Sequence, residues 1–196
     1  MKIYLVRHGQ TDYNLNDLLQ GWTDNELNEN GINQALELSQ KLKNEKFDII
    51  FSSDLKRAIQ TAQIINENNK FKTNLISDKR LREQYMGDWE GKKYSMLVQE
   101  YKEFFIKVKE NPFYFNPPNG EKFEDVVNRV KSFLNELEKQ NYEKILIVGH
   151  QIVNAIIFTI LENKNWNDFW NYKQKNSEIW ILNFIVNRTI TNTRFS

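Results

Sequence analysis

Apolar residues occur along this chain in two patterns. Short unbroken runs predict strands buried on both faces, and longer stretches in which apolar residues recur every three or four positions predict helices. The predicted strands are KIYLVR (2–7), FDIIFSS (47–53), the weaker TNLIS (73–77), KILIVG (144–149) and EIWILNFIV (178–186). The predicted helices cover residues 31–44, 55–68, 94–110, 123–140 and 150–163.

Cap and turn residues separate these elements. Asn28 and Asn30 are candidate caps of the first helix, and Asp54 is a candidate cap of the second. LREQYMGDWEG (81–91) contains two glycines and predicts an ordered loop. NPFYFNPPNG (111–120) holds all three prolines of the chain and predicts another.

Strands and helices alternate over most of the chain, and the connections are long enough to cross over between parallel strands. This order predicts an α/β fold: a three-layer sandwich with a mostly parallel central sheet, helices on both faces and a small helical and loop cap at about residues 94–120. A final run, TITNTRF (189–195), could pair with the last predicted strand and add an antiparallel edge. The 196 residues are expected to form one domain, 1–196, that includes the cap.

Composition narrows the classes of function. The formal net charge is +1, so nothing global favours nucleic acid or an anionic membrane as a partner, and affinity for an anion must come from local placement. The chain has no cysteine, which excludes disulfides, thiolate metal sites and a cysteine nucleophile. No apolar stretch approaches the ~18 residues of a spanning helix, and Asp12 and Asn14 interrupt any apolar leader. We therefore expect a soluble cytoplasmic protein.

Both histidines of the chain directly follow predicted strands. His8 comes after KIYLVR with Arg7 beside it, and His150 comes after KILIVG. The carboxyl ends of parallel strands meet at one edge of a sheet, where ligands bind in open α/β folds. The strand at 47–53 ends at the same edge, and Arg57 lies in the first turn of the helix that follows. The pattern predicts two imidazoles and two guanidiniums in one place.

Such a cluster of cations is unfavourable unless an anion lies within it. Arginine stays protonated, and two nearby guanidiniums disfavour imidazolium, so we expect both histidines to be neutral near pH 7. A guanidinium can bind two phosphate oxygens at once, which makes phosphate the predicted ligand. Helix N-termini after His8, Ser53 and His150 would add backbone donors, and Gly9 would let the chain approach the ligand closely.

Ordered motifs over most of the chain resemble those of one known family. Arg7-His8-Gly9-Gln10-Thr11, followed by Asn14, resembles the R-H-G-x-T-x-x-N signature of the histidine phosphatase superfamily, also called phosphoglycerate-mutase-like. Later stretches that resemble further motifs of this family are GWTDNELNENGINQA, SSDLKRAIQTA, LREQYMGDWEG, PNGEKFEDVVNRVKSFL and IVGHQIV. The matches run from residue 3 to about residue 160, which makes them far more specific than the first motif alone.

The resemblance implies a reaction and the residues that carry it. His8 would attack phosphorus and become a phosphohistidine, while Glu83 would protonate the leaving oxygen and then assist water. Arg7, Arg57 and His150 would hold the phosphoryl oxygens. The resemblance implies no metal ion and no other cofactor. Phosphoryl transfer depends mainly on positioning and charge stabilisation, and a glutamate beside a bound dianion should have a raised pKa.

Further residues are candidate substrate contacts. Asn14 and Gln20 could touch the ligand, and both could instead orient the loop after the first strand. Relatives in this family commonly carry glycine after the second histidine, where this chain has Gln151. The side chain of Gln151 takes space near the site and could contact the leaving group, so the substrate is harder to infer than the chemistry.

Neighbouring residues compete for some of these roles. Asp88 and Glu90 are rival acids in the same loop, and only the register of the motif selects Glu83. Arg82 is expected to be solvent-facing or structural, and Trp22 is expected to belong to the core.

Three functions fit this sequence. We favour a phosphatase that acts on a small phosphorylated metabolite, because dedicated mutases of the family are typically longer. The first alternative is a bisphosphoglycerate-dependent phosphoglycerate mutase, which must exclude water and hold a second anion. Lys92 and Lys93 are its candidate anion pair, and a solvated lysine pair is the more ordinary interpretation. The second alternative is a catalytically idle phospholigand- or protein-binding domain, which is weakened because every expected catalytic position is filled.

The aromatic segment 113–115 of the predicted cap bears on the substrate. It could form a lid that favours an apolar or ring-shaped leaving group. We favour the alternative that these rings pack the cap onto the sheet. The apolar strands at the end of the chain could also pair between two subunits, which leaves a homodimer open.

Overall fold

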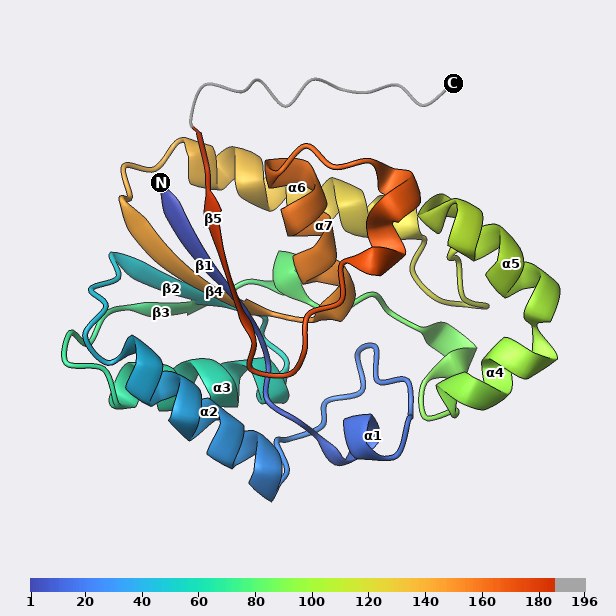
Figure 1. The fold of residues 1–196 in the computed structure, drawn as a ribbon, viewed down its shortest axis with the longest axis horizontal. Helices are drawn as coiled ribbons and strands as arrows, with labels where there is room; N and C mark the ends of the chain where they lie inside the picture. Colours follow the sequence, from blue (N-terminus) through green and yellow to red (C-terminus); the bar gives the residue numbers. More distant parts are fainter. Residues whose placement is uncertain (186–196) are drawn as a thin grey trace.

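A five-stranded sheet forms the centre of the computed structural model, which describes residues 1–185 (Figure 1). The strand order is β3-β2-β4-β1-β5. The parallel strands are β1 (Lys2–Arg7), β2 (Ile49–Ser52), β3 (Leu75–Ser77) and β4 (Lys144–Gly149). The edge strand β5 (Ile179–Asn183) pairs antiparallel with β1. The predicted mostly parallel sheet with an antiparallel edge is confirmed, and the strand predicted at 189–195 lies outside the described residues.

Helices cover both faces of the sheet (Figure 1). α2 (Glu29–Leu42) and α3 (Lys56–Glu67) pack on one face, and α6 (Phe123–Glu138) and α7 (Gln151–Leu161) pack on the other. Side chains of β1 alternate between the two faces: Tyr4 and Val6 join the cluster with α2 and α3, while Ile3 and Leu5 join the cluster with α6 and α7. Because both faces are covered, these strands are apolar throughout, and the predicted three-layer sandwich is confirmed.

The segment predicted as the cap, residues 94–120, lies beside the carboxyl edge of the sheet. It contains α4 (Tyr94–Glu100), α5 (Lys102–Glu110) and the 3₁₀ turn η3 (Pro112–Tyr114). The prediction of one helix over 94–110 is wrong, because the backbone of Tyr101 leaves helical geometry at φ −108° and ψ 40°. The break turns the rings of Phe104 and Phe105 onto Trp89, with centroids 5.3 and 5.7 Å away.

The segments predicted as loops at 81–91 and 111–120 lie against each other. Asp88 N donates to Pro118 O at 3.0 Å, and Glu121 N donates to Tyr85 O at 2.9 Å. Short 3₁₀ turns lie within or beside them, at η1 (Lys79–Leu81) and η2 (Gly87–Trp89). These contacts fix the position of the chain that carries Glu83.

One helix cap is as predicted and another is not. Asn28 caps α2 and accepts a hydrogen bond from Gly31 N at 2.8 Å. Asp54 does not cap α3, because its carboxylate accepts two hydrogen bonds from Arg82 at 2.7 Å each. Asp24 takes that place instead: its Oδ1 accepts from Lys56 N at 2.7 Å.

Two glycines let the loop after β1 pack against α2. A Cβ on Gly31 would overlap the carbonyl oxygen of Gln10, and a Cβ on Gly9 would lie 2.5 Å from Gly31 O. The missing side chain of Gly9 therefore allows this main-chain contact with Gly31. Among residues 1–185, no helix is both long enough and apolar enough to cross a membrane.

We expect Gly31→Ala to lower the free energy of unfolding by about 2 kcal/mol or more, because main-chain atoms cannot move aside as a flexible side chain would. Urea denaturation measures this change. Asn33→Ala, at an exposed position of the same helix, should stay within about 0.5 kcal/mol of the parent protein. A Gly31→Ala protein as stable as this control would refute the packing argument.

Candidate active site

The pairing of β1 with β4 places the two histidines side by side. Arg7 lies opposite Gly149 in the ladder, and His8 N donates to Gly149 O at 3.1 Å. The residues that follow, His8 and His150, therefore leave the same edge of the sheet. Their ring centroids are 5.1 Å apart, with 58° between the ring planes.

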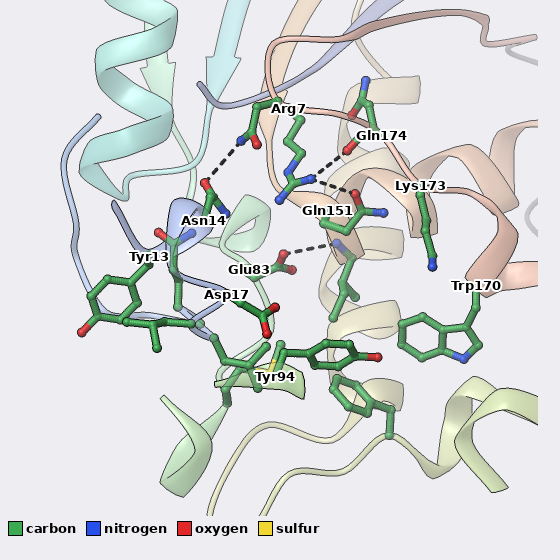
Figure 2. Close-up of a pocket in the computed structure, with 18 of the residues that line it drawn as sticks. Arg7, Tyr13, Asn14, Asp17, Glu83, Tyr94, Gln151, Trp170, Lys173 and Gln174 are labelled. Carbon is green, nitrogen blue, oxygen red and sulfur yellow. Dashed lines mark hydrogen bonds between the residues drawn. The ribbon is translucent and has the colours of Figure 1, made fainter. Parts of the chain in front are cut away.

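A cavity of about 880 Å³ opens at this edge (Figure 2). Seven of the eight predicted site residues line it: Arg7, His8, Asn14, Gln20, Arg57, Glu83 and Gln151. The eighth, His150, is fully buried against the ring of His8 and is not part of the lining. The structure thus brings the predicted cluster together, with His150 one layer further in.

Arg7 is anchored from two sides (Figure 2). Its Nη1 donates to Gln174 O at 2.8 Å and to Gln151 Oε1 at 3.2 Å, and Gln151 Nε2 donates to Tyr172 O at 3.0 Å. Gln151 therefore holds the guanidinium and links it to the chain before β5. The buried Nε of Arg7 has no hydrogen-bond partner within the described chain.

Arg57 is held in a similar way by backbone carbonyls. Its Nη2 donates to Gly21 O at 2.8 Å and its Nη1 to Thr23 O at 2.9 Å, and its Nε is buried without a partner in residues 1–185. Neither Arg57 nor Arg7 forms an ion pair with a carboxylate in that part of the chain. Burial lowers the pKa of Arg57 to about 10 and also lowers the pKa of Arg7. Two uncompensated cations therefore face the cavity.

The ring of His8 is held neutral and in one tautomer. Burial, followed by the charges of Arg57 and Arg7, lowers the pKa of His8 well below its ordinary value of 6.5. Its Nδ1 lies 2.6 Å from Gly9 O, and because a carbonyl oxygen can only accept, Nδ1 carries the proton. Nε2 is then left with a free lone pair, which is what a nucleophile requires.

His150 differs from His8 in its hydrogen bonding. Both of its ring nitrogens are buried and unpaired within the chain that the structure describes. Burial, followed by the charges of Arg57 and His8, lowers its pKa well below 6.5. A neutral imidazole with an unpaired N–H next to two guanidiniums can donate a hydrogen bond to an anion there.

Glu83 is fixed at both ends of the residue. Its Oε1 accepts from Gln84 N at 3.0 Å and its Oε2 from Ile152 N at 3.2 Å, while its carbonyl accepts from Trp22 Nε1 at 2.8 Å and from Arg129 Nη2 at 3.1 Å. Burial raises the pKa of Glu83 and outweighs these N–H donors and the two arginines. The sequence predicted a raised pKa from a bound dianion, whereas here burial alone suffices.

The rival acids in the same loop are engaged elsewhere. Asp88 is exposed and accepts from Asn119 Nδ2 at 2.9 Å. Glu90 accepts from Trp22 N and Thr23 Oγ1, each at 2.6 Å. Neither carboxylate lines the cavity, so the geometry agrees with the motif register that selected Glu83.

Some of the helix N-terminal amides from which the sequence predicted donors to the ligand already have partners within the protein. Lys56 N at the start of α3 already donates to Asp24, and Ile152 N in the first turn of α7 donates to Glu83. Asn14 N in α1 (Asp12–Leu15) donates to Thr11 Oγ1 at 3.3 Å. These amides instead hold side chains of the site in place.

Asn14 and Gln20 line the cavity and also order its loop. Asn14 Oδ1 accepts from Thr11 N at 3.1 Å and completes a capping box at the start of α1. Gln20 Oε1 accepts from Thr11 Oγ1 at 2.9 Å. Both side chains therefore orient the loop after β1, which is one of the two roles that the sequence left open. Both residues also line the cavity.

The loop before β5 belongs to the site and was missed. The backbone carbonyl of Gln174 holds Arg7. Its buried side-chain Oε1 accepts from Asn154 Nδ2 at 2.7 Å, and its Nε2 donates to Leu5 O at 2.8 Å. Asn176 Nδ2 donates to His8 O at 2.9 Å. The order of the strands could have indicated this loop. A strand antiparallel to β1 must begin where β1 ends, so the polar stretch before it reaches the same edge of the sheet.

Trp22 and Arg129 were also missed as parts of the site. The expectation that Trp22 belongs to the core is wrong, because the residue is 38% exposed. Its indole N–H and the guanidinium of Arg129 both hold the backbone carbonyl of Glu83. Within residues 1–185, no group of three or more His, Cys, Asp or Glu side chains is arranged to hold a metal ion.

Comparisons with known proteins agree with this geometry. The sequence model of the histidine phosphatase superfamily (branch 1) matches residues 3–193. A putative phosphoserine phosphatase 2 of Hydrogenobacter thermophilus is 34% identical over 178 residues, which cover 91% of this chain and 87% of that protein. A 2,3-bisphosphoglycerate-dependent phosphoglycerate mutase of Bartonella tribocorum is 35% identical over 169 residues, covering 83% and 82%. The structure of a mycobacterial glucosyl-3-phosphoglycerate phosphatase in complex with VO3 superposes with a TM-score of 0.82 at 28% identity, over 93% of this chain and 92% of that one.

Because Arg7 and Arg57 form no ion pair with a carboxylate in the described part of the chain, we expect tetrahedral oxyanions to stabilise the protein. Tungstate or inorganic phosphate at about 100 times its Kd should raise the Tm by about 5 °C or more, and chloride at equal ionic strength should not. Arg7→Gln should lose most of this shift relative to its own baseline. Lys92→Gln, a charge change away from the cavity wall, should keep it. An undiminished shift in Arg7→Gln would contradict the anion site.

Proposed function

The chain belongs to the histidine phosphatase superfamily and is a phosphomonoesterase of small phosphorylated metabolites, and we propose that it works through a phosphohistidine formed on His8. The observation that carries this mechanism is the state of His8. Its Nδ1 lies 2.6 Å from Gly9 O, which leaves Nε2 with a free lone pair, and burial together with the charges of Arg57 and Arg7 lowers the pKa of the ring.

The arginines supply the electrostatic part of the reaction. As Nε2 bonds to phosphorus, the bond from phosphorus to the leaving oxygen breaks and negative charge lies on the phosphoryl oxygens. The unpaired N–H groups of Arg7 and Arg57, together with His150, are available to those oxygens. Preorganised cations in a buried site stabilise this charge without reorganising, which is the role a metal ion has in other phosphoryl-transfer enzymes.

Glu83 acts as the general acid and then as the general base. In the first step its carboxyl protonates the leaving oxygen, and in the second its carboxylate takes a proton from the water that attacks the phosphohistidine. The raised pKa of Glu83 supports the first role, because a carboxyl that keeps its proton longer is a better acid at moderate pH. Its two backbone donors, Gln84 N and Ile152 N, keep the carboxyl aimed at the cavity.

A mutase remains the second candidate, because one similar protein is a phosphoglycerate mutase. The residues proposed from the sequence to hold its second anion do not support it. Lys92 and Lys93 do not line the cavity, and their backbones pair with those of Leu18 and Leu19. The idle alternative is disfavoured by the phosphatase relatives and by the protonation state of His8.

Glu83→Gln should lower kcat/KM for alkyl phosphates by roughly 10²–10⁴-fold, because an alkoxide needs a proton to leave. The same variant should affect 4-nitrophenyl phosphate far less, since nitrophenolate leaves unaided. For alkyl substrates the wild-type rate should fall as pH rises through the raised pKa of Glu83, and Glu83→Gln should lack that fall.

Phosphate release with EDTA present measures both effects. His8→Ala should abolish release from both substrates, and Asp88→Asn, at the exposed rival acid, should leave both rates unchanged. Equal losses on the two substrates in Glu83→Gln would contradict the role of Glu83 as the acid.

A mutase would return the phosphoryl group to a phosphoglycerate, whereas a phosphatase transfers it to water. With 3-phosphoglycerate and a bisphosphoglycerate primer, we expect phosphate release to be faster than interconversion of the phosphoglycerates. Coupled detection of 2-phosphoglycerate alongside free phosphate measures the two rates in one sample. Interconversion faster than release would reverse the order of the two functions.

A further inference from the structure

The cavity continues well beyond the phosphate-binding residues. Its volume of about 880 Å³ is near the upper end of the range for small-molecule pockets, so the scissile phosphoryl group occupies only one end of it. The far end is built by the last turn of α5, the 3₁₀ helix η4 (Trp166–Asn171) and the loop that follows. What lies at this end determines which leaving groups fit.

Trp170 is the fixed element of the far end. Its Nε1 donates to Val108 O at 2.8 Å, which ties η4 to α5, and its ring packs edge to face on Phe115 with centroids 5.4 Å apart. The indole is part-buried and lines the cavity, as Figure 2 shows. Such a held ring offers a rigid apolar surface to a ligand.

The aromatic residues of segment 113–115 mostly serve packing, as favoured from the sequence. Phe113 packs on Phe123 and Trp166, with centroids 5.3 Å away in each case, and Tyr114 is exposed. Only Phe115 of the three lines the cavity. The apolar surface for a leaving group therefore comes mainly from η4 and α5, not from the predicted lid.

Two lysines reach the cavity beside this ring. Lys109 directly follows Val108, and Lys173 comes three residues after Trp170, with its ammonium group on the cavity side in Figure 2. Neither forms an ion pair with a carboxylate of residues 1–185. A third lysine, Lys175, also lines the cavity. The protein as a whole is nearly neutral, so this positive end is a local feature.

The remaining acidic group of the wall lies apart from the lysines. Asp17 sits next to Tyr94 and away from Trp170 and Lys173 in Figure 2, and its Oδ2 accepts from Ser95 N at 3.0 Å. An anion in the middle of the cavity would meet this carboxylate, whereas an anion at the far end meets ammonium groups. Of the described wall residues, the two lysines therefore favour an anion near Trp170, away from Asp17.

Resting on the proposed function, we propose that Trp170, Lys109 and Lys173 form a leaving-group subsite for a second anionic group. The substrate class is then a phosphomonoester whose alcohol carries a carboxylate or a further phosphate, separated from the scissile ester by an apolar or planar portion that lies against Trp170. This site is distinct from the Lys92–Lys93 pair considered from the sequence.

Binding of matched phosphonates tests the subsite without turnover. The probes are benzylphosphonate, 4-(carboxymethyl)benzylphosphonate and 4-(phosphonomethyl)benzylphosphonate, and calorimetry at low ionic strength gives their Kd values. The wild-type protein should bind at least one doubly anionic probe about five- to tenfold more tightly than benzylphosphonate. Comparing the carboxylate probe with the bisphosphonate distinguishes the two kinds of anion.

Variants of the subsite separate this preference from general affinity. Lys109→Gln combined with Lys173→Gln should abolish the preference and leave the Kd of benzylphosphonate within about twofold, because a surface charge acts mainly on its own partner. Lys107→Gln combined with Lys164→Gln, exposed lysines that do not line the cavity, should keep it. The preference should also weaken as salt is added.

Two outcomes would overturn the subsite: equal affinity of all three probes for the wild-type protein, or an unchanged preference in the Lys109 and Lys173 double variant. Phosphate release from 4-nitrophenyl phosphate tests the proposed function separately. A protein that shows the binding preference but releases no phosphate would retain the subsite and lose the proposed mechanism. A protein that releases phosphate but lacks the binding preference would retain the proposed function and lose the subsite.

Discussion

The guanidiniums of the buried Arg57 and the half-buried Arg7, which form no ion pair with a carboxylate of residues 1–185, are the constraint from which the properties of this site follow. With its pKa lowered to about 10, the charged form of Arg57 is on the order of 3 kcal/mol less stable in the protein than in water. Backbone carbonyls at Gly21, Thr23 and Gln174 hold the arginines but do not neutralise them. A bound oxyanion would offset this cost, and burial together with the charges of Arg57 and Arg7 lowers the pKa of His8, as the proposed attack on phosphorus requires.

Strand pairing in the sheet brings the residues of this cluster together. Parallel pairing of β1 with β4 brings His8 next to His150, and parallel pairing of β2 with β4 brings the start of α3, with Arg57, to the same edge. The antiparallel edge strand completes the arrangement, because its start delivers the carbonyl of Gln174 to Arg7. The backbone amides of Lys56 and Ile152 donate to Asp24 and Glu83, so these contacts hold α3 and Glu83 in place in the absence of an anion.

Much of this could be predicted from the sequence, because strands buried on both faces are apolar throughout and the polar residues that end them must lie at one edge. Arg7, His8, Arg57, Glu83 and His150 were all found by that argument together with the family resemblance. Contacts that depend on three dimensions could not be found. Neither the pairing of Asp54 with Arg82, nor the hold of Trp22 on the backbone of Glu83, nor the break at Tyr101 has a local sequence signal. Gln151 is intermediate: its departure from the family pattern was visible, but its bond to Arg7 was not.

The proposed chemistry depends on a His8 imidazole that burial, together with the charges of Arg57 and Arg7, keeps neutral with its proton on Nδ1. The chain has only two histidines, so ¹⁵N NMR of the imidazoles resolves each ring as pH is lowered in the absence of oxyanions. We expect His8 to stay neutral well below pH 6.5 and to show the shifts of an Nδ1–H tautomer. Titration of His8 near pH 6.5, or a proton on Nε2, would contradict it.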